Sequence, residues 1–165
     1  MKSIVVLLLV FSFFSSSLAQ ELTLVKNRKS DFTIIIPEQP TLEEIKGAKV
    51  WQHYLFRIAG VELPVKKDSG LPGANEILIG KVNRPETAQL PYDEMGKDGL
   101  YIGNNGKQLI LTGGPKKGVE YAVYTFLEQY LGCKKYTATF EVVPQQKTIK
   151  IPQVADLQVP DFSFR

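Results

Sequence analysis

The stretch from Asp98 to Gly132 constrains the fold more than any other part of the chain. It opens with "DGLYIGNNGKQLILTGG", in which two runs of alternating apolar residues flank "NNG". This pattern predicts a β-hairpin, because an Asn-Gly pair readily forms the tight turn that joins two antiparallel strands. The continuation "PKKGVEYAVYTFLEQYLG" carries an apolar stripe at helical spacing, with Gly132 as its expected C-cap. A hairpin followed directly by an amphipathic helix predicts a helix that packs on a sheet.

The rest of the sequence alternates strand and helix signals. A second helix is predicted from Thr41 to Gly60, because Thr41 and Glu44 form a capping box and a glycine ends the pattern. Strands are predicted at residues 21–27, 32–37, 61–67 and 75–82, and short closing strands at 134–144 and 147–152. The predicted fold class is α+β: a two-layer α/β sandwich whose mixed, largely antiparallel sheet carries two main helices.

The first 19 residues have the organisation of a signal peptide. Lys2 precedes the apolar run Ile4–Phe14, and Ser17 and Ala19 supply the small residues that a signal peptidase requires. The apolar run is only about half of the ~20 residues that span a bilayer. We therefore expect cleavage after Ala19 and an exported protein, periplasmic or secreted, that has no membrane segment after cleavage. The mature domain is expected at residues 20–159.

The glycine-rich segment before the second predicted helix is not a phosphate-binding loop. Gly113 and Gly118 have the spacing of one, but Val119 and Glu120 occupy the positions that require lysine and a hydroxyl. Glu120 also places a negative charge in the first helical turn, where a bound anion would lie. We interpret the segment as a tight joint in which Gly118 lets the helix begin close to the sheet.

Composition excludes several other classes of function. The net charge is +3 and the lysine pairs are scattered, whereas a nucleic-acid surface needs a clustered basic stripe. The chain has one histidine and no H-E-x-x-H sequence, so neither a zinc site nor another cofactor is expected. Cys133 is the only cysteine, so no internal disulfide can form, and we expect it to be a buried, unreactive side chain.

Several motifs together resemble a known family. "DGLYIGNNGKQLILTGGPKKGVEYAVYTFLEQYLGCKKY", preceded by "AKVWQHYLFRIAGVELPV" and "NEILIGK", resembles the N-terminal domain of bacterial α-glucuronidases and related exported glycoside hydrolases. The layout is also similar to the non-barrel domain of the β-hexosaminidases. The resemblance spans nearly the whole mature chain. It implies a zincin-like fold without a metal site, in a non-catalytic domain that packs against a downstream (β/α)8 barrel carrying the catalytic carboxylates.

The chain itself offers no pair of catalytic carboxylates. Glycoside hydrolysis usually needs two carboxyl groups about 5–10 Å apart. Glu120 and Glu128 lie roughly on one face of a predicted helix, but about 12 Å apart along its axis. We therefore do not expect this chain alone to be an enzyme. If the chain continues, we expect it to be part of an α-glucuronidase-like or hexosaminidase-like hydrolase.

The final residues resemble the entry to such a barrel. Pro160, Phe162 and Arg165 match the P-x-F-x-x-R-G sequence at which the β-hexosaminidases enter their first barrel strand. The resemblance implies that residues 160–165 begin a barrel that is missing here and that Arg165 contacts substrate. The glycine that completes that pattern is absent, because the sequence ends at Arg165.

Two functions from different classes remain open. The first is a non-catalytic accessory domain of an exported glycoside hydrolase, with the outward-facing Tyr121, Tyr124 and Glu128 as the interface with the barrel. The second is a stand-alone carbohydrate- or surface-binding module, for which Trp51 and Tyr54 are the main candidates for an exposed aromatic platform. The sequence leaves open the sugar, the linkage, the parent enzyme's catalytic residues, the oligomeric state and the strand order.

Overall fold

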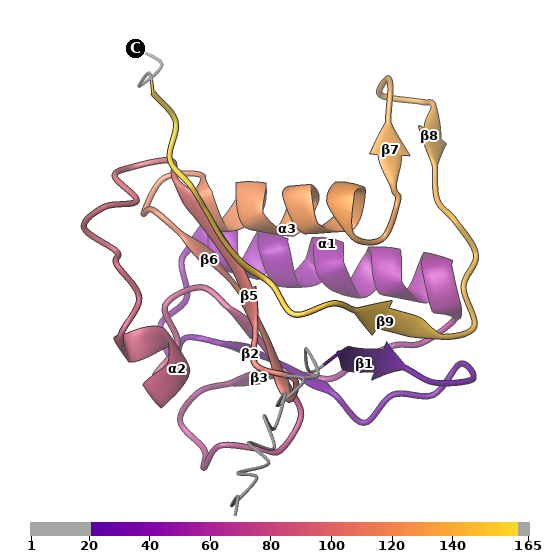
Figure 1. The fold of residues 1–165 in the computed structure, drawn as a ribbon, viewed down its shortest axis with the longest axis horizontal. Helices are drawn as coiled ribbons and strands as arrows, with labels where there is room; N and C mark the ends of the chain where they lie inside the picture. Colours follow the sequence, from indigo (N-terminus) through magenta and orange to yellow (C-terminus); the bar gives the residue numbers. More distant parts are fainter. Residues whose placement is uncertain (1–20, 162–165) are drawn as a thin grey trace, which may run out of the picture.

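A six-stranded sheet forms the centre of the computed structural model, which describes residues 21–161 (Figure 1). From edge to edge its strands are β10 (Ala155–Gln158), β5 (Leu100–Asn104), β6 (Gln108–Gly113), β4 (Glu76–Ile79), β2 (Thr33–Ile36) and β3 (Val65–Lys67). The pairs β10–β5 and β5–β6 are antiparallel, whereas the pairs β6–β4, β4–β2 and β2–β3 are parallel. The central sheet is therefore mixed, as predicted.

Two small antiparallel sheets complete the strand pairing of the described residues. One joins β1 (Leu22–Val25) to β9 (Ile149–Ile151), and the other joins β7 (Lys134–Lys135) to β8 (Glu141–Val142). The predicted α+β class, with a mixed and largely antiparallel arrangement of strands, is confirmed. The β7–β8 hairpin rises away from the sheet at one end of the molecule (Figure 1).

The helices α1 (Leu42–Ala59) and α3 (Gly118–Gln129) lie side by side on one face of the sheet (Figure 1). The predicted capping box is present, because the Thr41 side chain accepts from the Glu44 N–H and the Glu44 carboxylate accepts from the Thr41 N–H. Gly60 ends α1 in the left-handed conformation, at φ 71°. The boundaries of α1 therefore follow directly from the sequence signals.

Each face of the sheet has its own apolar cluster. The larger cluster lies between the sheet and the two helices, and its members include Ile34, Ile77, Leu109, Leu111, Trp51, Leu55, Val123 and Phe126. The smaller one lies on the opposite face and consists of Ile35, Leu78, Val82 and Ile110, with Leu90 and Tyr101 packed against it. The segment that follows Val82 contributes to this covering through Leu90 and contains a short helix, α2 (Pro85–Ala88), which the sequence did not predict.

The predicted hairpin at "NNG" is confirmed as β5–β6. Gly106 takes the left-handed conformation at φ 81°. The side-chain oxygen of Asn105 accepts hydrogen bonds from the N–H groups of Lys107 (3.0 Å) and Gln108 (2.8 Å). The turn therefore depends on both residue types of the Asn-Gly pair.

The segment from Gly113 to Gly118 is a close backbone joint between β6 and α3. A Cβ atom on Gly113 would lie 2.5 Å from the Gly99 carbonyl oxygen and 2.5 Å from the Gly118 carbonyl carbon. The Gly114 N–H donates to the same Gly99 oxygen at 2.8 Å. Because these glycines have no side chains, three backbone segments can lie in contact here. The sequence predicted such a close approach at the start of the helix.

The helix α3 ends earlier than the sequence indicated. Its last helical residue is Gln129, followed by Tyr130 as the C-cap, and Gly132 was expected to be the cap. Gly132 does take the left-handed conformation, at φ 70°. It turns the chain so that the Cys133 N–H donates to the Leu127 carbonyl at 2.9 Å. The glycine therefore reverses the chain just beyond the helix.

Candidate functional site

The predicted interface residues lie on the outer side of α3, and two of them, Tyr124 and Glu128, share a groove with residues of the β7–β8 hairpin. Tyr121 and Tyr124 are 41% and 39% exposed, and Glu128 is also exposed. The hairpin adds two aromatic side chains, Tyr136 and Phe140, which are 62% and 58% exposed and whose rings stack with centroids 5.6 Å apart. These five residues are referred to below as the α3–hairpin surface.

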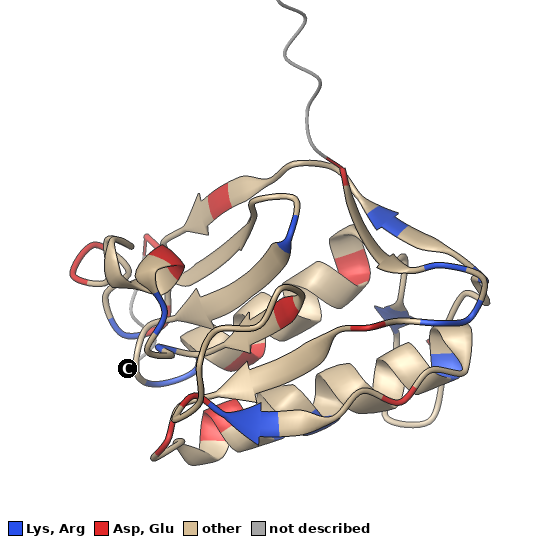
Figure 2. Ribbon diagram, turned by 90° about the horizontal axis from the view of Figure 1, so that it is seen from below, with Lys and Arg blue, Asp and Glu red and all other residues tan. Residues whose placement is uncertain are grey.

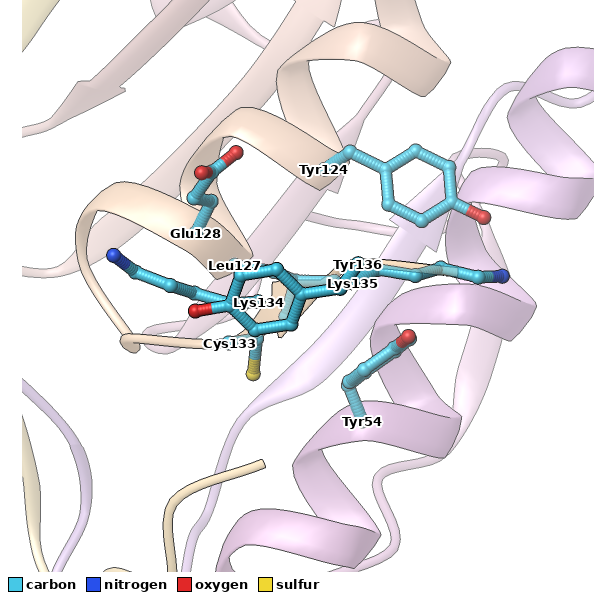
Figure 3. A pocket seen from close by; sticks show the side chains of 8 residues that line it. All are labelled: Tyr54, Tyr124, Leu127, Glu128, Cys133, Lys134, Lys135 and Tyr136. Carbon is cyan, nitrogen blue, oxygen red and sulfur yellow. The ribbon is translucent and has the colours of Figure 1, made fainter. Parts of the chain in front are cut away.

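A groove of about 430 Å³ is set into this surface. Figure 3 shows side chains from α1, from α3 and from the segment leading into the hairpin around a common space. The lining residues are Tyr54, Tyr124, Leu127, Glu128, Cys133, Lys134, Lys135 and Tyr136. The groove therefore combines aromatic walls with charged groups of both signs.

A polar cluster fixes the hairpin to α1. The Tyr54 hydroxyl donates to Oε2 of Glu141 at 2.5 Å, and Arg57 pairs with the other carboxylate oxygen. Burial, assisted by the hydrogen bond to Glu141, raises the pKa of Tyr54 to about 12. The hydrogen bonds from Tyr54 and Arg57 lower the pKa of Glu141. At neutral pH the cluster thus consists of a neutral phenol, a carboxylate and a guanidinium.

Cys133 borders the groove without being a reactive group. The side chain is 6% exposed, and burial raises the pKa of its thiol to about 11. The neutral thiol is a poor nucleophile, so the residue is chemically inert at neutral pH. This agrees with the sequence interpretation of Cys133 as a buried side chain.

The carbohydrate platform at Trp51 and Tyr54 requires correction. Trp51 is fully buried and packs edge-on against Phe126, with ring centroids 5.0 Å apart. Tyr54 is only 9% exposed, and its hydroxyl is engaged by Glu141. Both residues lie on the buried side of α1, because this side of the helix packs against α3 and the core. Neither ring presents a free face on which a sugar could stack.

The remaining predicted positions lie outside the described residues. These are the signal peptide at residues 1–19 and, at the other end, Phe162 and Arg165. Sequence reasoning also missed two members of the α3–hairpin surface, Tyr136 and Phe140. The two aromatics separated by "TAT" in "YTATF" are a signal that could have indicated them, since the segment was predicted to be a strand.

A second cleft, of about 530 Å³, lies where α1 and α3 begin. Its lining includes Glu44, Tyr92, Gly113 and Lys116, and the Lys81 ammonium lies 4.7 Å from the centre of the Tyr92 ring. The Glu44 carboxylate already accepts from the Thr41 N–H and hydroxyl. Glu44, one of the polar groups of this cleft, therefore serves the cap of α1.

The charges of the described residues do not form one basic face. Figure 2 shows lysine and arginine positions interspersed with aspartate and glutamate positions along the visible elements. Between residues 21 and 161, no three side chains of the metal-binding types gather into a site. No helix in this part of the chain has the length and apolar character needed to cross a membrane.

Comparison with known proteins gives a fold relationship. No family model and no curated protein matches the sequence significantly. The GH20 β-N-acetylhexosaminidase of Streptomyces coelicolor A3(2) is similar in structure, with a TM-score of 0.57 and 16% identity over 87% of this chain and 25% of its own. A β-hexosaminidase of Streptomyces plicatus gives a TM-score of 0.55 and 18% identity over 87% of this chain and 24% of its own.

A GH115 4-O-methyl-α-glucuronidase with specificity for decorated arabinogalactans is also similar. Its TM-score is 0.56 at 13% identity, over 84% of this chain and 18% of its own. At these identities the likeness establishes the fold. The chain spans about a quarter or less of the matched proteins, so it shares the fold of one part of much longer glycoside hydrolases.

Proposed function

We propose that residues 20–159 form a non-catalytic accessory domain of an exported glycoside hydrolase, packing against a downstream (β/α)8 barrel. One observation carries the proposal: the fold covers 84–87% of this chain but only 18–25% of each matched hydrolase. A domain that recurs as a minor part of long hydrolase chains fits a supporting role. The catalytic groups then belong to the larger remainder of such proteins.

The carboxylates of the described residues support this division of roles. Glu44 is engaged in the α1 cap, Glu76 is paired with Arg84, and Glu141 is held by Tyr54 and Arg57. Glu120 and Glu128 are both on α3, eight residues and therefore about 12 Å apart along its axis. A retaining hydrolase needs about 5–5.5 Å and an inverting one about 6.5–9.5 Å. The arrangement therefore favours a domain that does not itself cleave glycosides.

The interface with the barrel is assigned to Tyr121, Tyr124 and Glu128. Tyrosine is enriched at protein interfaces, because its ring supplies contact area and its hydroxyl a hydrogen bond. Two such rings stand on the outer side of α3, more than a third exposed. Arg165, by its match to the barrel-entry sequence, is proposed as a substrate contact in the longer protein. Residues 160–165 would begin the barrel itself.

Export is part of the same proposal. Residues 1–19 are proposed as the signal peptide, so the mature protein should begin at Gln20. Sequencing of the N-terminus of the protein collected outside the cytoplasm tests this assignment. A mature protein that retains Met1 would contradict it.

The size of the native protein tests the accessory role. An antibody against residues 20–161 captures the protein from its native cells, and mass spectrometry gives its intact mass. We expect a species heavier by roughly 200–400 residues, the size of a barrel. That species should hydrolyse uronic-acid or N-acetylhexosamine glycosides. A native chain that ends at Arg165 would overturn the proposal, and a glycan-binding screen would then test the stand-alone module.

A further inference from the structure

We propose that the β7–β8 hairpin is a docking element for the catalytic domain, with Tyr136 and Phe140 as its anchors. This inference rests on the proposed function and adds to it the element, the residues and the chemistry of the contact. The expected partner surface is an apolar ridge that carries acidic side chains.

The exposure of the hairpin side chains points to a protein contact. Tyr136 and Phe140 are more than half exposed, and Val142 in β8 is 46% exposed. Tyr136 lines the same groove as Tyr124 of α3, which is 39% exposed. Contiguous exposed apolar groups of this kind are typical of interaction sites, and aromatic residues supply most of the binding energy at such sites.

The hairpin is held in place before any partner binds. The Glu141 carboxylate, at the start of β8, receives the Tyr54 hydroxyl and the Arg57 guanidinium from α1. The Tyr136 and Thr137 N–H groups both donate to the Phe140 carbonyl, at 3.0 and 3.1 Å, and so close the tip. A rigid element loses little conformational entropy on binding, which favours tight association.

The charge of the groove indicates the character of the partner. Lys134 and Lys135 line it, and the ion pairs found among residues 21–161 involve neither of them. Their ammonium groups can therefore pair with carboxylates of a partner.

A domain that follows residue 161 can reach this surface from the point where the chain leaves. Gln158 at the end of β10 pairs with Leu100, which pairs in turn with Gly113 just before α3. The chain thus leaves near the start of α3, while the hairpin rises at the opposite end of the helix (Figure 1). The 12 residues of α3 span about 18 Å. A barrel that follows residue 161 is wide enough to cover that distance.

The test uses the whole native enzyme with a protease site inserted after Asp161. After cleavage, the affinity between the accessory domain and the catalytic part is measured by titration. We expect Tyr136→Ser and Phe140→Ser each to weaken association at least tenfold, whereas Phe56→Ser should leave it unchanged. Phe56 is a matched control, because it is 56% exposed but lines a different groove with His53 and Glu62.

The outcomes separate this inference from the proposed function. If the two parts stay associated and both hairpin variants bind like Phe56→Ser, the hairpin assignment is wrong while the accessory role stands. A native chain that ends at Arg165 overturns both. Hydrogen exchange of the hairpin amides, measured with glucuronate or N-acetylglucosamine alone, gives a further check. Protection by a free sugar would mean that the groove is a saccharide site and would overturn the docking assignment.

Discussion

At the residue scale, the most deeply buried charges of the described chain are those of Glu76 and Arg84. Their side chains are only 3% and 2% exposed, and two hydrogen bonds of 2.9 and 3.0 Å join them. Arg84 also donates to the carbonyls of Asp68 and Asn83, and the Gly73 N–H donates to Glu76 at 2.8 Å. The pair therefore ties the loops on either side of β4 to the sheet.

Replacing one partner should be costly. Glu76→Gln removes the negative charge and leaves the Arg84 guanidinium buried without a counter-charge, which typically costs about 3–5 kcal/mol. Urea denaturation at neutral pH measures the loss, and Glu62→Gln at an exposed position is the control. The double variant Glu76→Leu/Arg84→Met should be less destabilised than Glu76→Gln. A single variant as stable as the control would show that the pair does not stabilise the fold.

The same pair gives stability a defined pH dependence. Burial alone would raise the pKa of Glu76, but hydrogen bonds from Arg84 and Gly73 lower it below the ordinary value of 4.5. A carboxyl group whose pKa is lower in the folded protein than in the unfolded one stabilises the fold at pH values above its unfolded-state pKa. This stabilisation is lost as the pH falls through the folded-state pKa. The stability difference between the native protein and Glu76→Gln should therefore shrink on acidification from neutral pH to about pH 3.

At the scale of elements, the joint between β6 and α3 sets how closely the helix approaches the sheet. A Cβ atom on Gly118 would collide with the carbonyl oxygen of Gly99, a backbone atom that cannot rotate away. We expect Gly118→Ala to destabilise the protein by about 1–3 kcal/mol, as overpacking does. The control is Gly70→Ala, because nothing lies within 4 Å of its added methyl group. Equal urea midpoints for the two variants would rule out a steric role for the joint.

Elements with local chemical signals could be predicted from the sequence. The capping box at Thr41, the Asn-Gly hairpin and the glycine joint each depend on residues close together in the chain, and each is found in the structure. The strand order depends on contacts between distant segments, so no local pattern contains it. For the same reason β10 was missed: "ADLQ" has no strong strand signal and pairs with β5 only through the fold.

The candidate site was predictable only in part, for a similar reason. The outward positions on α3 follow from helical periodicity, so Tyr121 and Tyr124 could be identified. Trp51 was a candidate for the exposed aromatic platform but is fully buried, because α3 packs against it through Phe126. The groove requires the hairpin to lie next to both helices. The polar cluster at Glu141 holds the hairpin to α1, a contact that periodicity does not indicate.

At the scale of the whole molecule, the first strand of the described chain pairs with one of its last two strands. Leu22 in β1 pairs with Ile151 in β9, and Glu21 forms an ion pair of 2.6 Å with Lys150. Ile149 and Ile151 are 1% and 0% exposed, so β9 is a part of the core contributed by the last stretch of sequence. One edge of the six-stranded sheet is β10, the strand that follows β9. The fold is thus closed only when residues near both ends are present.

Truncation should reveal this closure and locate the domain boundary. A chain of residues 20–146 lacks β9 and β10, and each buried isoleucine contributes about 1.5–3 kcal/mol. The free energy of unfolding of a whole domain is only about 5–15 kcal/mol. Loss of the two isoleucines, together with the exposure of β1, should therefore abolish cooperative folding. A chain of residues 20–159 keeps every strand and should melt at the same temperature as residues 20–165. Thermal melts followed by circular dichroism compare the three chains, and a cooperative melt of residues 20–146 would show that β9 is dispensable.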